Sequence, residues 1–158
     1  MEELYIEGGH RLEGTVRIHG AKNSVLPLLA AMTLIDEPVT LENCPKLSDV
    51  RATLSILHAL GCRAGQEGGV IRGGGHPTSA HIADELMRQM RSSIIFLGPL
   101  LAVCGRAEVS LPGGCELGPR PIDWHLQALR RMGAEIEESG NHHRIVISEI
   151  PYMVNKLT

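Results

Sequence analysis

Cys115 is the residue in this sequence with the most distinctive chemistry. It lies within residues 111–121 (LPGGCELGPRP), where glycines and prolines make up more than half of the segment. Glycine permits positive φ, and proline fixes φ and removes a donor, so we predict a loop. Glu116 and Arg120 place charge near the thiol, and nearby charge tunes the reactivity of a thiol. A surface turn with a free cysteine fits the same composition, and spacing alone leaves both interpretations open.

Two cationic residues each precede a predicted apolar helix. Lys22 lies in residues 20–24 (GAKNS), where Asn23 or Ser24 is the expected helix cap, and Arg91 is followed by Ser92 and Ser93. A helix N-terminus beside a cation favours an anion, because unpaired amides and the helix dipole both attract negative charge. A solvated cation before a capped helix is the alternative. Because the arrangement occurs twice, we favour anion binding at both positions.

Hydrophobic periodicity and turn residues predict the elements that position these side chains. We predict strands at 4–6, 14–19, 39–41, 108–111, 134–137 and 141–147, a hairpin over 62–72, and helices at 25–33, 48–60, 83–90, 94–103 and 122–132. Placing Gly61 over Gly133 gives an offset of 72 residues (133 minus 61), which indicates an internal repeat. The Cys115 segment enlarges the strand-to-helix junction of the second unit alone, and an insertion in one unit suggests function there.

The composition indicates one soluble globular domain. The chain has 158 residues, 43% of them hydrophobic, and a formal net charge of -3 with both signs interspersed. This charge pattern predicts no nucleic-acid or membrane partner. The longest apolar runs are about 11 residues, well below the roughly 20 of a spanning helix. The N-terminal residues are acidic and lack a hydrophobic signal region, so we expect a cytoplasmic protein.

Metal binding is not predicted. Four cysteines, at positions 44, 62, 104 and 115, form no CxxC pair, so we expect reduced thiols, three of them packing residues. His142 and His143 are neighbours on a predicted strand, where their side chains point to opposite faces, so a shared metal site is disfavoured.

Three ordered motifs carry a family resemblance. Residues 112–115 (PGGC) with 118–123 (GPRPID), residues 20–24 (GAKNS) and residues 90–93 (MRSS) resemble the bacterial UDP-N-acetylglucosamine 1-carboxyvinyltransferases. The resemblance runs from about residue 1 to about residue 147. It implies an α/β fold of the enolpyruvyl-transferase, EPSP synthase-like type, built from repeated βαβαββ units and incomplete in this chain.

The resemblance also implies how the chain divides. Residues 1–21 would be strands that in the family belong to the other domain. Residues 22–147 would be two repeat units of the domain with the catalytic loop, about 22–90 and 91–147, and residues 148–158 a divergent tail. Chains of the family continue well beyond this point, so we expect a truncated product.

The resemblance implies transfer of the enolpyruvyl group from phosphoenolpyruvate to the 3-hydroxyl of UDP-N-acetylglucosamine, with release of phosphate, the first committed step of peptidoglycan synthesis. No metal or cofactor is implied, since phosphoenolpyruvate is a co-substrate. The residues that match the family's site are catalytic Cys115, phosphoenolpyruvate-binding Lys22, Asn23 and Arg120, and UDP-N-acetylglucosamine-binding Arg91, Arg120, Pro121, Ile122, Asp123 and Trp124.

By resemblance, Cys115 is the proton donor, forms a covalent adduct with phosphoenolpyruvate and is alkylated by fosfomycin. An ordinary thiol pKa of about 8.5 leaves it protonated near neutrality, whereas Arg120 would favour the thiolate, and the sequence leaves the balance open. Asp123 is placed to accept a hydrogen bond from the uracil edge or a backbone donor.

The family's catalytic aspartate lies beyond this chain, so we expect the chain alone to be inactive and to self-associate through surface that the missing part covers. Two alternatives remain. One is a nucleotide-sugar-binding or interaction fragment without catalysis. The other is a shikimate-pathway enolpyruvyl transferase, which shares the fold and phosphoenolpyruvate but lacks the cysteine loop.

Overall fold

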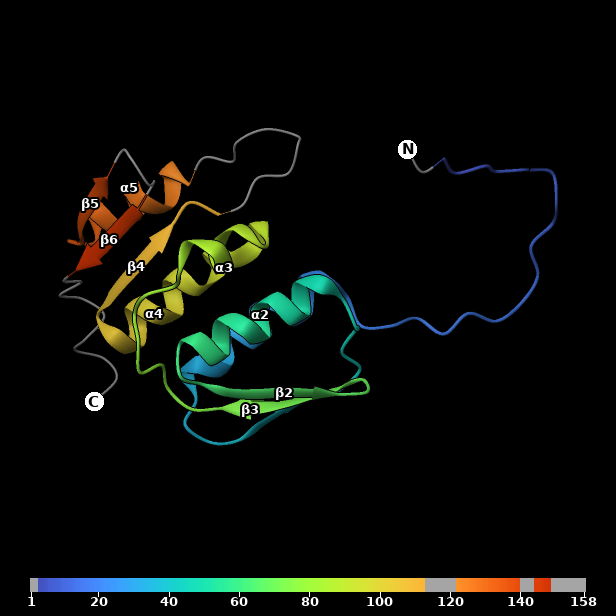
Figure 1. Cartoon of the computed structure of the whole chain (residues 1–158), viewed down its shortest axis with the longest axis horizontal. Helices are drawn as coiled ribbons and strands as arrows, with labels where there is room; N and C mark the ends of the chain where they lie inside the picture. Colours follow the sequence, from blue (N-terminus) through green and yellow to red (C-terminus); the bar gives the residue numbers. More distant parts are fainter. Residues whose placement is uncertain (1–2, 113–121, 140–143, 149–158) are drawn as a thin grey trace.

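The computed structural model describes residues 3–112, 122–139 and 144–148 (Figure 1). The α-helices in chain order are α1 (Lys22–Ala31), α2 (Ser48–Ala59), α3 (Asp84–Arg88), α4 (Leu97–Cys104) and α5 (Asp123–Arg131). Two 3-10 helices, η1 (Met32–Leu34) and η2 (Arg91–Phe96), extend α1 and precede α4. The strands are β1 (Val39–Leu41), β2 (Arg63–Glu67), β3 (Val70–Gly74), β4 (Arg106–Ser110), β5 (Glu135–Ser139) and β6 (Arg144–Ser148).

The predicted internal repeat is confirmed by the topology of the two sheets. The first sheet has the order β1-β3-β2 and the second β4-β6-β5, and all named pairs are antiparallel. In each unit a helix joins the two outer strands, and the last strand returns between them. Gly68, with φ of 58°, allows the tight β2–β3 hairpin that the sequence predicted.

The helix ends repeat at the level of single hydrogen bonds. After α2, Gly61 N donates to His58 O and Cys62 N donates to Leu57 O; after α5, Gly133 and Ala134 make the equivalent bonds. This is the Schellman arrangement, which needs a left-handed residue after the helix. Gly61 and Gly133 supply it with φ of 87° and 91°. The 72-residue offset therefore has a structural basis.

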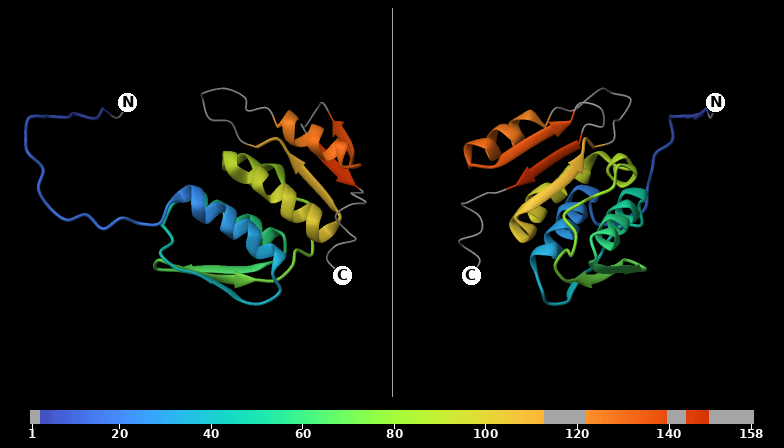
Figure 2. Two further views of the ribbon diagram at one scale, coloured as in Figure 1. Left: turned by 180° about the vertical axis from the view of Figure 1, so that it is seen from behind. Right: turned by 60° about the vertical axis from the view of Figure 1, so that its left-hand side comes forward.

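One apolar core joins the two units. Phe96, Leu29, Ile56 and Ile147, which come from both units, are fully buried. Helices lie against one face of each sheet, and α1 packs beside α2 while α4 packs against η1 (Figure 2). The link between the units also pairs with the second sheet, because Ile82 N donates to Glu108 O.

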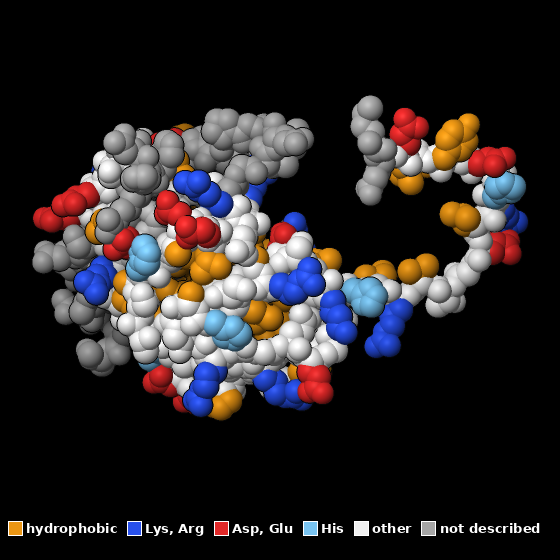
Figure 3. Space-filling model, in the orientation of Figure 1, with side chains coloured by type: hydrophobic (Ala, Val, Ile, Leu, Met, Phe, Trp, Pro, Cys, Tyr) orange, Lys and Arg blue, Asp and Glu red, His pale blue; other side chains and the backbone are white. Residues whose placement is uncertain are grey.

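The N-terminal section differs from the prediction of strands at 4–6 and 14–19. Residues 3–20 contain no helix or strand and run away from the body as an extended arm (Figures 1 and 3). Their large apolar side chains, including Tyr5 and Val16, are exposed. Alternating apolar residues form a strand only beside a partner, and no described strand pairs with residues 3–19. Its assignment to another domain stays a prediction.

Two helix starts also differ from the sequence analysis. Asn23 and Ser24 do not cap α1, which begins at Lys22, has no side-chain cap and contains Pro27. The helix predicted over 94–103 divides into η2 and α4, with Gly98 and Pro99 in the first turn of α4. Proline is tolerated there because first-turn N–H groups lack helical partners.

Candidate functional site

Lys22 and Asn23 are the first two residues of α1, and both are exposed. No side chain caps α1, and Ser24 N and Val25 N both donate to Ala21 O at 3.1 Å. The N–H groups of Lys22 and Asn23 are therefore the ones that an incoming anion can use. Lys22 therefore stands at the end of the helix that favours negative charge, as the sequence predicted, although it is the first helical residue rather than one that precedes the cap.

A tight backbone contact fixes where α1 begins. Gly20 N donates to Asn43 O at 3.2 Å, and a Cβ on Gly20 would lie 2.1 Å from the same oxygen. Asn43 itself has φ of 56°, a conformation that asparagine tolerates better than most residues. Only glycine fits at position 20, and the contact brings the start of α1 against the loop that leads to α2.

The same contact brings Lys22 to Asp49. The Lys22 Nζ to Asp49 Oδ2 distance is 2.9 Å, and Asp49 lies in the first turn of α2. Ser48 and Asp49 are the first two residues of α2, and neither side chain caps it. No local spacing signal links Lys22 to a residue 27 positions away (49 minus 22), so this partner was missed.

Arg91 is the first residue of η2 and is partly buried. Thr53 Oγ1, fully buried, donates to Asp49 O at 2.8 Å and lies 3.4 Å from Met90 Sδ. This contact links α2 to the residue that precedes Arg91. The starts of α1, α2 and η2 consequently lie at one end of the body (Figures 1 and 2). The two predicted cations are thus brought to the same end.

The remaining predicted residues are only partly described. Ile122 is buried just before α5, Asp123 is the first residue of α5, and Trp124 has 81% of its surface exposed. Cys115, Arg120 and Pro121 lie outside the described residues. The catalytic role of Cys115 and the nucleotide-binding roles at positions 120–124 stay predictions.

The described thiols have the character of packing residues. Cys44 and Cys62 are buried, and Cys104 is partly buried. Burial raises the pKa of all three thiols, and at Cys104 the nearby Arg106 partly offsets it. A raised pKa keeps a thiol protonated and poorly nucleophilic near neutrality. Within residues 3–112, 122–139 and 144–148, no group of three His, Cys, Asp or Glu side chains is arranged to hold a metal.

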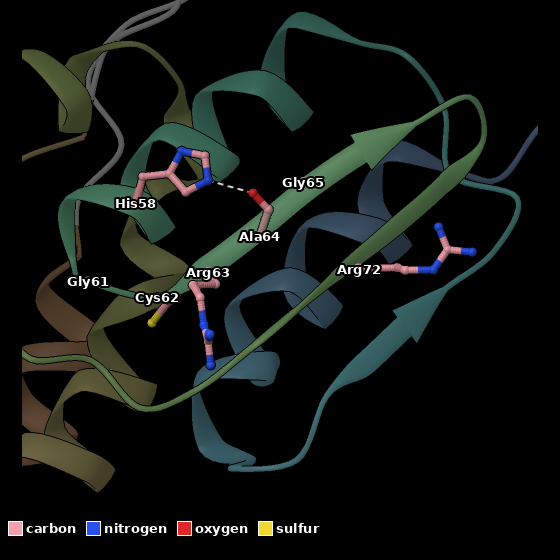
Figure 4. Close-up of a pocket in the computed structure, with 7 residues that line it drawn as sticks. All are labelled: His58, Gly61, Cys62, Arg63, Ala64, Gly65 and Arg72. Carbon is pink, nitrogen blue, oxygen red and sulfur yellow. Dashed lines mark hydrogen bonds between the residues drawn. The ribbon is translucent and has the colours of Figure 1, made fainter.

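An open pocket beside the end of α2 lies apart from these residues (Figure 4). Its lining includes His58, whose ring contacts the Ala64 carbonyl, and the arginines Arg63 and Arg72. The two guanidinium groups point in different directions, so they do not converge on one ligand. The candidate site is therefore at the starts of α1, α2 and η2 and not in this pocket.

These observations define a repeated α/β protein that presents cations at the starts of two helices. The model of the EPSP synthase (3-phosphoshikimate 1-carboxyvinyltransferase) family matches residues 6–155, and the chain belongs to this family. The predicted fold class is thereby confirmed. No helix in the described part of the chain is long and apolar enough to cross a membrane.

Curated relatives at about half identity are enzymes of one name. The UDP-N-acetylglucosamine 1-carboxyvinyltransferase of Acinetobacter baylyi is 50% identical over 148 residues, which cover 92% of this chain and 35% of the relative. The enzyme of the same name from Sulfurovum sp. is 50% identical over 147 residues, again 92% of this chain and 35% of the relative. The chain therefore spans about a third of the length of the relatives it matches, and the predicted family resemblance is confirmed.

Solved structures support the fold. The enolpyruvyl transferase NikO from Streptomyces tendae aligns with a TM-score of 0.74 at 24% identity, covering 89% of this chain and 31% of that one. The EPSP synthase from Acinetobacter baumannii aligns with a TM-score of 0.62 at 20% identity, covering 85% and 32%. At this level of identity these likenesses establish the fold alone.

Proposed function

We propose that this chain is part of a UDP-N-acetylglucosamine 1-carboxyvinyltransferase. The reaction is transfer of the enolpyruvyl group from phosphoenolpyruvate to the 3-hydroxyl of UDP-N-acetylglucosamine, which releases phosphate and begins peptidoglycan synthesis in the cytoplasm. The observation that carries the proposal is the identity of half the aligned residues with enzymes of that name.

The positions of the cations are consistent with this chemistry. Phosphoenolpyruvate carries a phosphate and a carboxylate, and Lys22 offers a flexible ammonium beside uncapped helix amides. Asn23, next in the same turn, has an amide that can orient a carboxylate or hydroxyl. Arg91, the first residue of η2, is proposed for the nucleotide sugar. Planar guanidinium groups suit bidentate binding of phosphate.

Cys115 is proposed as the acid that protonates C3 of phosphoenolpyruvate while the sugar hydroxyl adds to C2. The hydroxyl would give its proton to a base outside this chain. Loss of a proton from C3 and departure of phosphate from C2 then restore the C2=C3 double bond, now in the enol ether product. Arg120 would hold the phosphoenolpyruvate anion, and Pro121, Ile122, Asp123 and Trp124 would bind the uridine nucleotide. Three other thiols are buried or partly buried, which leaves Cys115 as the proposed reactive one.

We further propose that the chain alone is inactive. It spans about a third of its relatives, so a site assembled from the whole length would be incomplete, and loss of positioning and water exclusion lowers the rate of reaction. The same incompleteness favours self-association, since Leu28 in α1 and Ile35 just after η1 are 51% and 42% exposed. Light scattering over a range of concentrations tests this point.

A shikimate-pathway enolpyruvyl transferase is the second candidate, because the matching family bears that enzyme's name. Because the chain alone is proposed to be inactive, ligand binding rather than turnover separates the two enzymes: we expect binding of UDP-N-acetylglucosamine and not of shikimate 3-phosphate. A phosphate-release assay with each substrate then tests the inactivity, since release with either one would contradict it. Nucleotide binding without release is also the behaviour of the third alternative, a binding fragment without catalysis.

Intact mass after incubation with fosfomycin tests the assignment on the chain itself. We expect labelling that is enhanced by UDP-N-acetylglucosamine, maps to Cys115 and disappears in Cys115→Ser. Cys44 serves as an internal control because its thiol is buried. Absence of labelling with and without the nucleotide would overturn the proposal that this chain carries the thiol half of the site.

A further inference from the structure

The Lys22–Asp49 ion pair joins the first turns of two helices. Lys22 begins α1, and Asp49 is the second residue of α2. The side chains are 50% and 26% exposed, so the pair is open to a ligand from solvent. Among the described residues, Asp49 is the ion-pair partner of Lys22.

The position of Lys22 favours a counter-ion. A cation in the first turn of a helix meets the positive end of the helix dipole, which disfavours it. The first turn of α1 contains no acidic residue that offsets this effect, whereas α2 supplies Asp49. The Asp49 carboxylate is therefore an anion that the protein itself holds against the Lys22 ammonium.

The backbone around this pair is built to hold the two side chains together. Gly20, two residues before Lys22, contacts Asn43, which lies six residues before Asp49. At the other side, Thr53 Oγ1 donates to Asp49 O at 2.8 Å from within the core. The carboxylate thus approaches Lys22 from a fixed helix, while the lysine side chain is the mobile partner.

We propose that Asp49 is a positioning residue that acts through Lys22 as an intramolecular competitor for the ligand phosphate. Without a ligand, the Asp49 carboxylate forms an ion pair with the Lys22 ammonium. A phosphoryl group, with three acceptor oxygens and more charge than a carboxylate, displaces it, and the carboxylate takes the ammonium back when phosphate leaves. The inference rests on the proposed function in assigning a phosphoryl group to Lys22.

The competition predicts a definite sign for Asp49→Asn. Asparagine keeps the size of the side chain but removes the charge, so the ammonium loses its resident counter-ion and inorganic phosphate loses a repulsive neighbour. Phosphate affinity at Lys22 should rise about two- to fivefold, the range that an exposed ion pair contributes. A residue that only stabilised the fold would lower the affinity or leave it unchanged.

The experiment follows the lysine ammonium groups of the full chain by NMR with side-chain labelled lysine. The chain has three lysines, at positions 22, 46 and 156, so Lys22→Gln assigns the Lys22 signal. Inorganic phosphate is titrated at constant ionic strength into the wild type, Asp49→Asn and Asp49→Glu. Asp84→Asn is the matched control, because Asp84 also lies in a helix first turn, pairs with Arg88 and changes the net charge equally.

Tighter phosphate binding in Asp49→Asn, near wild-type binding in Asp49→Glu and no change in Asp84→Asn would support the proposal. Equal or weaker binding in Asp49→Asn would overturn it while leaving Lys22 as a phosphate ligand. If phosphate moved the Lys22 signal in no variant, the role of Lys22 in the proposed function would fail as well, whereas fosfomycin labelling would still test Cys115 independently.

Discussion

The two repeat units share one scaffold but differ at the junction between their first strand and the following helix. In the first unit that junction is short and held by backbone contacts: Cys44 N donates to Gly69 O at 2.7 Å, and Gln66 Nε2 donates to Pro45 O at 3.3 Å. In the second unit the corresponding segment between β4 and α5 is longer and contains Cys115.

The difference shows where this repeated fold accommodates chemistry. The strand order and the glycine-ended helix are the same in both units, so they serve the core. The first unit uses its short junction to fix Asn43 against Gly20 and thereby place Lys22. The second unit uses the same place in the chain for a thiol-bearing insertion. One unit thus supplies a positioned cation and the other the proposed reactive group.

The largest expected effect tests whether the two units form one cooperative structure. Phe96 is fully buried at the end of η2, and Leu29 is fully buried in α1 of the first unit. We expect Phe96→Ala to lower the free energy of unfolding by about 3–5 kcal/mol and Leu29→Ala by about 2–5 kcal/mol, because each leaves a core cavity. Urea unfolding followed by circular dichroism measures both values.

Hydrogen exchange then assigns the loss to one unit or to both. Because the core is shared, we expect Leu29→Ala to speed exchange in β6 of the second unit as much as in β3 of the first. Faster exchange confined to the unit that carries the substitution would contradict a shared core and would mean that the units unfold independently.

Gly20→Ala tests the backbone contact that is specific to the first unit. The added Cβ would meet Asn43 O at 2.1 Å, and backbone cannot move aside as a flexible side chain does. We expect a loss of about 1–3 kcal/mol, as for other overpacked sites, and a change in the Lys22 ammonium signal as α1 shifts from Asp49. Gly8→Ala is the control, because nothing lies within 4 Å of a Cβ there. Equal effects of the two substitutions would contradict the proposed contact.

The repeated glycines after α2 and α5 give a smaller effect. Alanine at either position must adopt the left-handed conformation, which costs roughly 1–2 kcal/mol. At Gly61 a further cost is expected, because the added Cβ would also lie 2.2 Å from Thr78 Oγ1. Thermal unfolding of both variants measures the difference. If Gly61→Ala left the unfolding temperature unchanged while Gly133→Ala lowered it, the two helix ends would not be equivalent.

The sequence predicted the repeat because its signals are local. Hydrophobic spacing and glycines such as Gly61 and Gly133 act within a few residues, and the structure has helix ends and hairpins where these signals occur. The same local signals failed for the N-terminal arm, where alternation marks a strand only if a partner is present. The Lys22–Asp49 pair was missed for a related reason, since it depends on how Gly20 seats one helix against the loop of another.

The smallest expected effect concerns the buried thiols, which are present in both units. Burial raises the pKa of Cys44, Cys62 and Cys104 above the ordinary value of about 8.5. As pH rises through that value, thiols of the unfolded chain lose protons before those of the folded chain do, so the unfolded state gains stability. The contribution of these thiols is therefore complete below about pH 8.5 and is lost progressively above it.

Replacing all three thiols with alanine isolates their part of the pH dependence. The cavities lower stability at every pH, but the slope of unfolding free energy against pH above the ordinary thiol pKa should become flatter than in the wild type. Equal slopes would mean that these thiols are not protected from ionisation by the fold. Cys62→Ala and Cys104→Ala then compare one thiol from each unit, because Arg106 counteracts the rise in pKa at Cys104 but not at Cys62. The single Cys62 replacement should flatten the slope more than the Cys104 replacement.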